Sequence, residues 1–281
     1  MSKSLSRFHI LIVLVACMMF CGISTSAFAE ATDEINVNWK VDGGLTGSTG
    51  ALWLTFELLK DYVAPQKCIW CKTNQMDETI TDSLSWPTPK YAAKTADAVA
   101  FGGIPLLAVG ALALSSGLEG RIQNLGADAI LLAESITISS LANQFVKFGV
   151  GRARPFTIRD DPEMYKDRAD DNLSFYSGHT NMAFALVVSA GTIAHIRNYK
   201  AEPYIWGIGM PLALFVAYTR VAAQKHYFTD VLIGAVIGSA IGFAVPWLHR
   251  NTSKNRKNNS SVVRDVSMNL GNNMVSISGK F

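Results

Sequence analysis

Five apolar segments fill the chain between residues 96 and 248, at 96–118, 125–148, 179–197, 204–222 and 228–248. The stretches 98–118 and 231–248 contain no charged residue. A membrane-spanning helix needs about 20 mostly apolar residues, so these two stretches are long enough to cross a bilayer. The pattern predicts an all-α fold, a helical bundle that is embedded in a membrane.

Two features of these segments predict how the helices pack. Gly234, Gly238 and Gly242 recur at every fourth position, which places them on one helix face where a neighbouring helix can approach closely. Asp128 and Glu134 lie within the second apolar segment. Carboxylates are costly in lipid, so both are expected to face the interior of the bundle.

Shorter patterns lie towards the two ends of the chain. Apolar and polar residues alternate over residues 35–41, which predicts a half-buried strand. A second alternation over 266–277, interrupted by a Gly-Asn-Asn turn, predicts a C-terminal hairpin that could pair with this strand. Residues 49–64 are amphipathic up to Pro65 and predict a helix. The bundle is therefore expected to carry a small β addition.

The first 29 residues resemble a secretory signal peptide. Lys3 and Arg7 precede an apolar run at 10–21, and small residues precede a cleavage position after Ala29. Two alternatives are an uncut membrane anchor and lipoprotein processing at Cys17. The sequence thus predicts four parts: a signal peptide at 1–29, an N-terminal region at 30–95, a main domain at 96–250, and a polar tail with the hairpin at 251–281.

Composition excludes several classes of protein. Of the 281 residues 49% are hydrophobic and only 17% are charged, against about 25% charged in average soluble domains. This excludes a disordered chain, and a net charge of +3 does not indicate a nucleic-acid partner. Signal cleavage leaves two cysteines, Cys68 and Cys71, for which a disulfide is the main expectation in an oxidising compartment. A redox or metal role is the alternative.

Three polar blocks lie at junctions between an apolar helix and a polar loop. They contain Lys147, Arg154 and Pro155; Ser177, Gly178 and His179; and Arg220, His226 and Asp230. Tracing the helices up and down places all three junctions at the same end of the bundle.

The residue types in these blocks suit phosphoryl transfer. Arginine and lysine can hold phosphate oxygens, and a glycine N–H at a helix start adds the positive end of the helix dipole. His226 and Asp230 are four residues apart, so on a helix they would share a face, with the carboxylate holding one imidazole nitrogen and leaving the other free to attack phosphorus. His179 can protonate the leaving oxygen.

The blocks resemble the three signature motifs of the type 2 phosphatidic acid phosphatase (PAP2) family, which includes bacterial acid phosphatases and vanadium haloperoxidases. The family pattern is Lys, six residues, Arg-Pro; then Pro-Ser-Gly-His; then Ser-Arg, five residues, His, three residues, Asp. This chain departs from it at Tyr176, where the family has proline, and at Thr219, where it has serine. The resemblance covers about residues 96–248.

The resemblance implies a role for each matching residue. Phosphate would be bound by Lys147, Arg154, Ser177, Gly178 and Arg220. His226 would be the nucleophile that forms a phosphohistidine, Asp230 would orient it, and His179 would be the general acid. No metal or other cofactor is implied.

The expected protein is therefore a cell-envelope hydrolase of phosphomonoesters or pyrophosphates. A membrane-embedded bundle favours a lipid substrate such as phosphatidate, a polyprenyl pyrophosphate or lipid A. The alternatives are a soluble periplasmic acid phosphatase, a vanadium haloperoxidase and a non-enzymatic membrane protein.

The expected topology has five spans, and the chain starts outside the cytoplasm. Residue 30 and all three motifs would then lie on the periplasmic side of a bacterial inner membrane, and Arg197, Lys200 and Arg250 would lie inside.

Overall fold

The computed structural model describes residues 34–158, 169–251, 267–271 and 274–278, so the predicted signal peptide and the turn of the predicted hairpin lie outside the described residues. The main helices are α2 (Trp39–Leu58), α4 (Gln75–Leu84), α5 (Pro89–Ala98), α6 (Ile104–Leu118), α7 (Leu125–Val150), α9 (Gly178–Arg197), α11 (Met210–Ala222) and α12 (Phe228–Leu248). Shorter helices are α3 (Lys60–Val63), α8 (Pro155–Ile158) and α10 (Glu202–Tyr204). Single π-helical turns at Val99–Gly103 and Ile205–Gly209 join α5 to α6 and α10 to α11.

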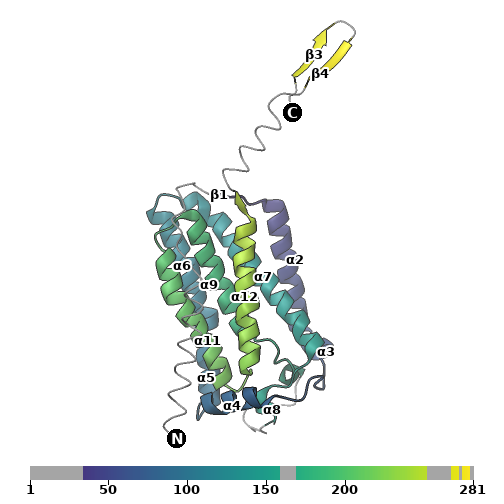
Figure 1. The fold of residues 1–281 in the computed structure, drawn as a ribbon, viewed down its shortest axis with the longest axis vertical. Helices are drawn as coiled ribbons and strands as arrows, with labels where there is room; N and C mark the ends of the chain where they lie inside the picture. Colours follow the sequence, from purple (N-terminus) through teal and green to yellow (C-terminus); the bar gives the residue numbers. More distant parts are fainter. Residues whose placement is uncertain (1–33, 159–168, 252–266, 272–273, 279–281) are drawn as a thin grey trace. The chain divides into compact units, whose positions relative to one another are not determined.

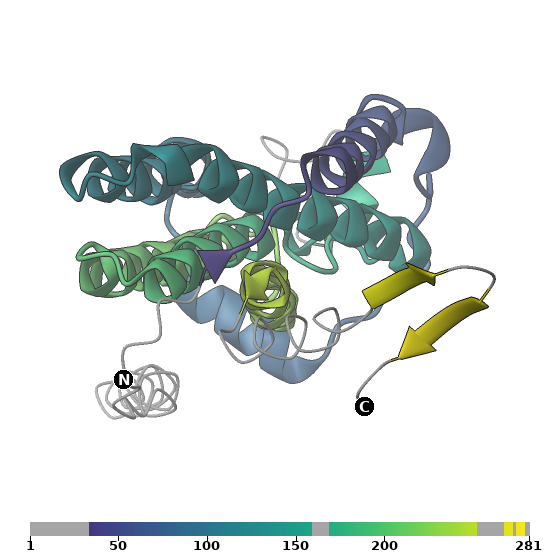
Figure 2. The same ribbon diagram turned by 90° about the horizontal axis from the view of Figure 1, so that it is seen from above.

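Helix α9 lies at the centre of the bundle, in contact with α6, α7, α11 and α12 (Figures 1 and 2). Almost every residue of α9 is buried. A Cβ atom at Gly238 of α12 would lie 2.2 Å from the carbonyl oxygen of Asn181, and one at Gly242 would lie 2.4 Å from that of Ala185. The predicted glycine face is confirmed, because only glycine allows α12 to lie this close to the α9 backbone.

The two carboxylates of the second apolar segment face the interior, as predicted. Asp128 is buried and accepts hydrogen bonds from Arg197 Nε at 3.1 Å and from the Tyr199 hydroxyl at 3.0 Å. Glu134 is also buried, with 3% of its surface exposed.

The outer faces of the bundle are apolar. Four helical stretches are long and apolar enough to cross a membrane: Pro89–Leu118, Ile122–Val150, Glu202–Ala222 and Phe228–Leu248. Their outward side chains include Leu106, Leu114 and Val236, each of which is more than half exposed. Exposed leucines along a whole bundle match a lipid environment, and the predicted all-α membrane bundle is confirmed.

The N-terminal prediction was wrong: the predicted strand over 35–41 is a strand only at β1 (Glu34–Ile35), and α2 begins at Trp39. The Asn38 side chain caps α2 by accepting from the backbone N–H of Lys40 and Val41. This local cap outweighs the alternating pattern. The predicted helix over 49–64 is correspondingly the second half of α2 followed by α3.

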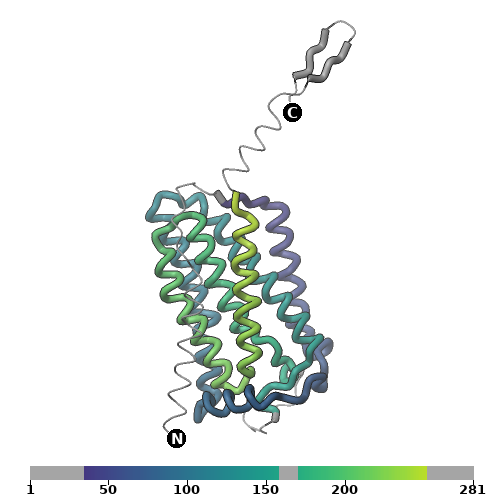
Figure 3. The backbone as a smooth tube through the Cα atoms, viewed as in Figure 1, coloured from purple at the N-terminus to yellow at the C-terminus, as the bar shows by residue number. Residues whose placement is uncertain are grey.

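Helix α2 runs parallel to α7 along the bundle (Figure 3). Near their starts, a Cβ atom at Gly126 would lie 3.2 Å from the Trp39 ring. Further on, the Thr49 hydroxyl donates to that of Thr137 at 2.9 Å. The rings of Phe56 and Phe145 then meet edge to face at 5.2 Å.

The terminal strands pair differently from the expectation. β1 pairs antiparallel with β2 (Arg250–Asn251), while β3 (Ser267–Gly271) and β4 (Met274–Ser278) pair with each other in the predicted hairpin. Within the described sheets the hairpin therefore does not join β1.

This pairing also overturns the five-span scheme. We call the end of the bundle where α7 and α11 finish and α9 and α12 begin the motif end, and the opposite end the far end. Because β1 pairs beside the last residue of α12, residues 34 and 251 both lie at the far end. Helix α2 is the additional traverse that leads the chain to the motif end, so the described chain does not begin on the side of the motifs.

Candidate active site

The three sequence blocks meet at the motif end. Lys147 lies in the last turn of α7, which ends at Gly151 with a left-handed φ of 53°. Ser177 caps the start of α9, where its hydroxyl accepts from Thr180 N at 3.4 Å. Arg220 lies in the last turn of α11.

Lys147 and Gly178 face each other across the site. A Cβ atom at position 178 would lie 3.4 Å from Lys147 Nζ and 2.9 Å from Asn143 Oδ1. The backbone N–H of Ser177 donates to the carbonyl oxygen of Asp230 at 3.1 Å and so joins the second block to the third. A side chain at position 178 would occupy the space between the lysine and the start of α9.

Arg154 is held by a short 3₁₀ turn at Ala169–Asn172. Its Nε donates to the Asp170 carbonyl oxygen at 2.8 Å, and its Nη2 lies 3.0 Å from Asp170 Oδ2. Burial alone would raise the pKa of Asp170, but the positive charges of Arg154 and Lys147 hold it well below its usual range. Asp170 is therefore an anion that offsets part of the positive charge of Arg154 and Lys147.

A further cation, Lys225, lies beside the predicted nucleophile and was missed by the sequence reasoning. Its Nζ lies 4.4 Å from the centre of the Phe156 ring. Burial, together with the positive charges of Arg154 and Arg220, lowers the pKa of Lys225 to about 8. Such crowding of positive charge is favourable only where an anion is to be bound.

Asp97, from the end of α5, pairs with two of the predicted residues. Its Oδ1 lies 2.7 Å from His179 Nε2 and 3.4 Å from Arg220 Nη1. The Phe101 ring contacts the His179 ring edge to face at 4.8 Å. Sequence reasoning missed Asp97, although a single carboxylate at the edge of an apolar segment was a usable signal.

His226 is buried, and its ring is held by a backbone group. Its Nδ1 lies 2.7 Å from the Ser174 carbonyl oxygen, so Nδ1 carries the proton and the lone pair on Nε2 is left for a substrate. Burial, followed by the charges of Arg154, Arg220 and Lys147, holds the pKa of His226 well below its ordinary value. The imidazole is therefore neutral at neutral pH, as a nucleophile must be.

Asp230 does not share a helix face with His226 in the predicted way. Helix α12 begins at Phe228, so His226 precedes it, and Asp230 Oδ2 lies 3.9 Å from His226 Nδ1. The same oxygen accepts from Tyr227 N at 2.9 Å and from the Ser174 hydroxyl at 2.5 Å. The carboxylate thus positions the turn that carries His226, and the closest contact to the ring is the Ser174 carbonyl.

Arg152 connects Asp230 to helix α4. Its guanidinium is fully buried, with Nη1 2.5 Å from Asp230 Oδ1 and Nη2 2.8 Å from Asp77 Oδ2. It lies between the rings of Trp70 and Tyr227, 4.2 Å from each centre. Arg152 and Asp77 were absent from the predicted site, although Arg152 falls inside the first block.

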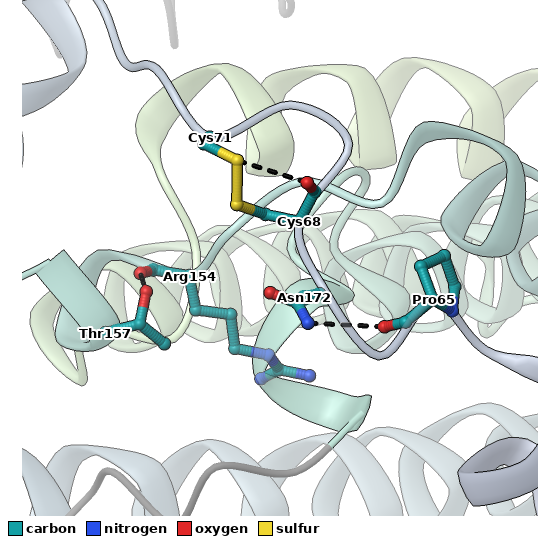
Figure 4. Close-up of a disulfide and its surroundings, with 6 residues drawn as sticks. All are labelled: Pro65, Cys68, Cys71, Arg154, Thr157 and Asn172. Atoms are coloured by element: carbon teal, nitrogen blue, oxygen red, sulfur yellow. Dashed lines mark hydrogen bonds between the residues drawn. A yellow bond between two sulfur atoms is a disulfide. The ribbon is translucent and has the colours of Figure 1, made fainter.

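A disulfide between Cys68 and Cys71 closes a short loop (Figure 4). Trp70 belongs to this loop, and its ring lies over Arg152. The backbone N–H of Ile69 donates to the Gly151 carbonyl at 2.8 Å, and that of Ala153 donates to the Trp70 carbonyl at 3.1 Å. A Cβ atom at Gly151 would lie 2.9 Å from Ile69 Cγ1, so glycine lets this loop approach. The disulfide loop, for which the sequence indicated no function, thus supports the first block.

Comparisons with known proteins find phosphatases among the relatives of this chain. A family model described as the PAP2 superfamily matches residues 128–254. An undecaprenyl-diphosphatase of Sulfolobus acidocaldarius is 29% identical over 41% of this chain and 52% of its own length. Human phospholipid phosphatase 2 is 27% identical over 37% of this chain and 44% of its own. A lipid A 1-phosphatase of Porphyromonas gingivalis is 27% identical over 47% of this chain and 26% of its own.

A solved structure, a transmembrane PAP2-type phosphatidylglycerolphosphate phosphatase from Bacillus subtilis, covers 75% of this chain and 96% of its own at 19% identity, with a TM-score of 0.47. The chain spans about half or less of the length of the curated relatives it matches. The fold and the three blocks define a helical bundle with an anion site at one end. The match of residues 128–254 to the PAP2 superfamily model confirms the resemblance drawn from the motifs.

Proposed function

We propose that this protein is a membrane phosphatase that hydrolyses a phosphomonoester or diphosphate of a lipid through a phosphohistidine on His226. The observation that carries the proposal is the state of His226. It is buried and neutral, its Nδ1 is held by the Ser174 carbonyl, and the charges of Lys147, Arg154 and Arg220 act on it. A neutral nucleophile among cations is what attack on a phosphate anion requires.

The proposed reaction has two steps. Lys147, Arg154, Arg220, the Ser177 hydroxyl and the Gly178 N–H hold the phosphoryl oxygens while His226 Nε2 attacks phosphorus. The bond from phosphorus to the lipid oxygen breaks, and His179 gives that oxygen a proton. In the second step His179 takes a proton from water, the hydroxide attacks the phosphohistidine, and inorganic phosphate leaves. Asp97, which bonds to His179, fixes the orientation of this acid and base.

A lipid is the substrate class that the surroundings of the site favour. The four apolar helical stretches would hold the motif end at the level of the lipid headgroups. The names of the relatives are those of phosphatases of lipids: undecaprenyl diphosphate, phospholipid and lipid A. A soluble acid phosphatase with the same residues would not need exposed leucines along its helices. A carbonate wash of membranes distinguishes the two functions: retention of the protein supports the lipid phosphatase, and release supports the soluble acid phosphatase.

We also propose that the motif end faces the oxidising side of a bacterial inner membrane, the periplasm, because the Cys68–Cys71 disulfide lies at that end. Arg197, Lys200 and Arg250 at the far end would then be cytoplasmic. Signal cleavage after Ala29 would instead release residue 30 into the periplasm and, since β1 lies at the far end, turn the motif end to the cytoplasm. Signal cleavage after Ala29 and a periplasmic motif end therefore exclude each other. Protection of a C-terminal tag from protease in intact spheroplasts supports the periplasmic site, and ready cleavage contradicts it.

The chemical step is tested by trapping the intermediate. Purified full-length protein is mixed with a ³²P-labelled phosphatidate or polyprenyl diphosphate and quenched in alkali, in which a phosphohistidine survives. We expect label on the wild-type protein and none on His226→Ala. Label that persists on His226→Ala would assign the nucleophile to another residue.

A further inference from the structure

A second cluster of titratable side chains lies at the far end, outside the phosphatase site. Asp42 comes from the first turn of α2, Glu134 from α7, and His249 from the residue that follows α12. One candidate ligand atom from each lies within 4.8 Å of the other two. Asp42 and Glu134 are 5% and 3% exposed, so the cluster is formed inside the bundle rather than on its surface.

The histidine and the aspartate already have the orientation of metal ligands. His249 Nδ1 lies 2.8 Å from the Val245 carbonyl oxygen, which fixes the proton on Nδ1 and directs the Nε2 lone pair towards Asp42 Oδ1, 3.4 Å away. The other oxygen of Asp42 accepts from Asn38 N at 2.7 Å. Histidine ligands of metals commonly donate their second nitrogen to a backbone carbonyl in this way.

Glu134 supplies an independent observation. Its Oε2 is buried and has no hydrogen-bond partner among the described residues. The hydroxyl oxygen of Thr46, one turn after Asp42 on the same face of α2, is likewise buried without a partner in that part of the chain. A buried carboxylate oxygen without a donor is costly, and a bound cation removes that cost.

We propose that Asp42, Glu134 and His249 bind a divalent transition-metal ion, for which Zn²⁺ is the best match. One imidazole nitrogen and two carboxylate oxygens form a ligand set that zinc accepts, at bond lengths of about 2.0–2.2 Å. Two ligands of a tetrahedral ion then lie about 3.4 Å apart, which is the Asp42–His249 separation. The widest separation, up to 4.8 Å, has to close by about 1.4 Å, which side-chain rotation provides.

The ion would be structural. It would join α2, α7 and α12 at the end of the bundle where β1 also pairs with β2, and it lies away from the residues that act on phosphate. A structural ion contributes its binding free energy to the folded state. It would therefore attach helix α2 to the bundle. Helix α2 lies outside the family match, which covers residues 128–254.

The test is direct zinc binding to full-length protein in detergent, stripped with EDTA, desalted and titrated with ZnCl₂. We expect one zinc per chain, a thermal midpoint that rises with zinc and falls with EDTA, and at least about 100-fold weaker binding in His249→Gln and in Glu134→Gln. His195→Gln is the matched control, because His195 is an exposed histidine near the same end that pairs with Glu202. It should bind zinc as the wild type does.

The double variant His179→Ala, His226→Ala separates this site from the phosphatase. It should hold one zinc per chain while it hydrolyses nothing. Wild-type protein that retains less than about 0.1 zinc per chain and shows no change of midpoint overturns the proposal, even if the glutamine variants fail to fold. Equal binding by wild type and both glutamine variants overturns it as well, and loss of zinc in the double variant would show that the ion sits in the phosphatase site.

Discussion

Two buried clusters of titratable side chains, one at each end of the bundle, differ in their chemistry. At the motif end, α7, α9 and α11 present Lys147, His179 and Arg220 beside a neutral His226. At the far end, α2 and α7 present Asp42 and Glu134, and α12 ends at His249. In the first cluster the charges of Arg154, Arg220 and Lys147 lower the pKa of His226, and in the second a buried carboxylate oxygen of Glu134 has no donor among the described residues.

Helix direction reinforces this difference. The motif end contains the N-termini of α9 and α12, where unpaired N–H groups favour anions. The far end contains the C-terminus of α12, where carbonyl groups favour cations. The same antiparallel helices can therefore serve an anion at one end and a cation at the other, and the residues in their first and last turns decide which is bound.

The largest effect is expected from His226→Ala. The substitution removes the attacking nitrogen, so hydrolysis of every phosphate ester should fall by at least about 10⁴-fold. His195→Ala, a change to an exposed histidine near the far end, should keep wild-type activity in the same release assay. Substantial turnover by His226→Ala would show that His226 is not the nucleophile, and the motif end would then lack the chemistry that distinguishes it from the far end.

His179→Ala should fail in a way that depends on the leaving group. An alkoxide needs the proton as its bond breaks, whereas a nitrophenolate hardly does. The variant should lose about 10²–10⁴-fold on an alkyl or lipid phosphate. On an aryl phosphate it should give a burst of nitrophenol followed by slow turnover, because the same histidine activates water. No burst, with equal losses on both substrates, would exclude His179 as the general acid.

The sequence predicted the residues of the candidate site that lie within the motifs. It missed the residues that contact them only in the folded structure. Lys147, Arg154, Ser177 and His226 were found because each belongs to a spaced pattern. Asp77 and Asp97 were not found, because they precede the motifs by many residues and only tertiary packing brings them to Arg152 and His179.

The fold could be predicted on the same basis. The apolar segments predicted the helices, and the glycine spacing predicted a close contact of α12 with a neighbouring helix, which is α9 in the structure. The start of α2 was missed because the Asn38 cap is a single local interaction that the alternation over 35–41 concealed. The pairing of β1 with β2 was missed because two residues on each side leave almost no sequence signal.

Asp77→Asn tests whether the carboxylate from α4 positions the motif end. Asparagine keeps the shape and one acceptor for Arg152 but leaves the buried guanidinium with the charge of Asp230 alone. Since Asp77 does not reach the phosphate site, kcat should fall by about 10-fold, about 1.4 kcal/mol, while KM is unchanged. Glu78→Gln, an exposed change on the same helix, is the control. A raised KM with unchanged kcat would contradict a positioning role.

The smallest effect on chemistry is expected midway between the two ends, at Gly238→Ala. The new Cβ would lie 2.2 Å from the Asn181 carbonyl oxygen, a backbone atom that cannot move without α9. Overpacking of this kind costs about 1–3 kcal/mol, which would lower the thermal midpoint in detergent by about 3–10 °C. Gly110→Ala is the matched control, because among the described residues a Cβ there meets nothing within 4 Å, and its midpoint should not fall.

Residual hydrolysis by Gly238→Ala at 20 °C should stay within about 10-fold of the wild type, since each end keeps its own hydrogen bonds. Equal midpoints for the two alanine variants would mean that α12 can move away from α9 freely, and the two ends would then not be held in one rigid frame.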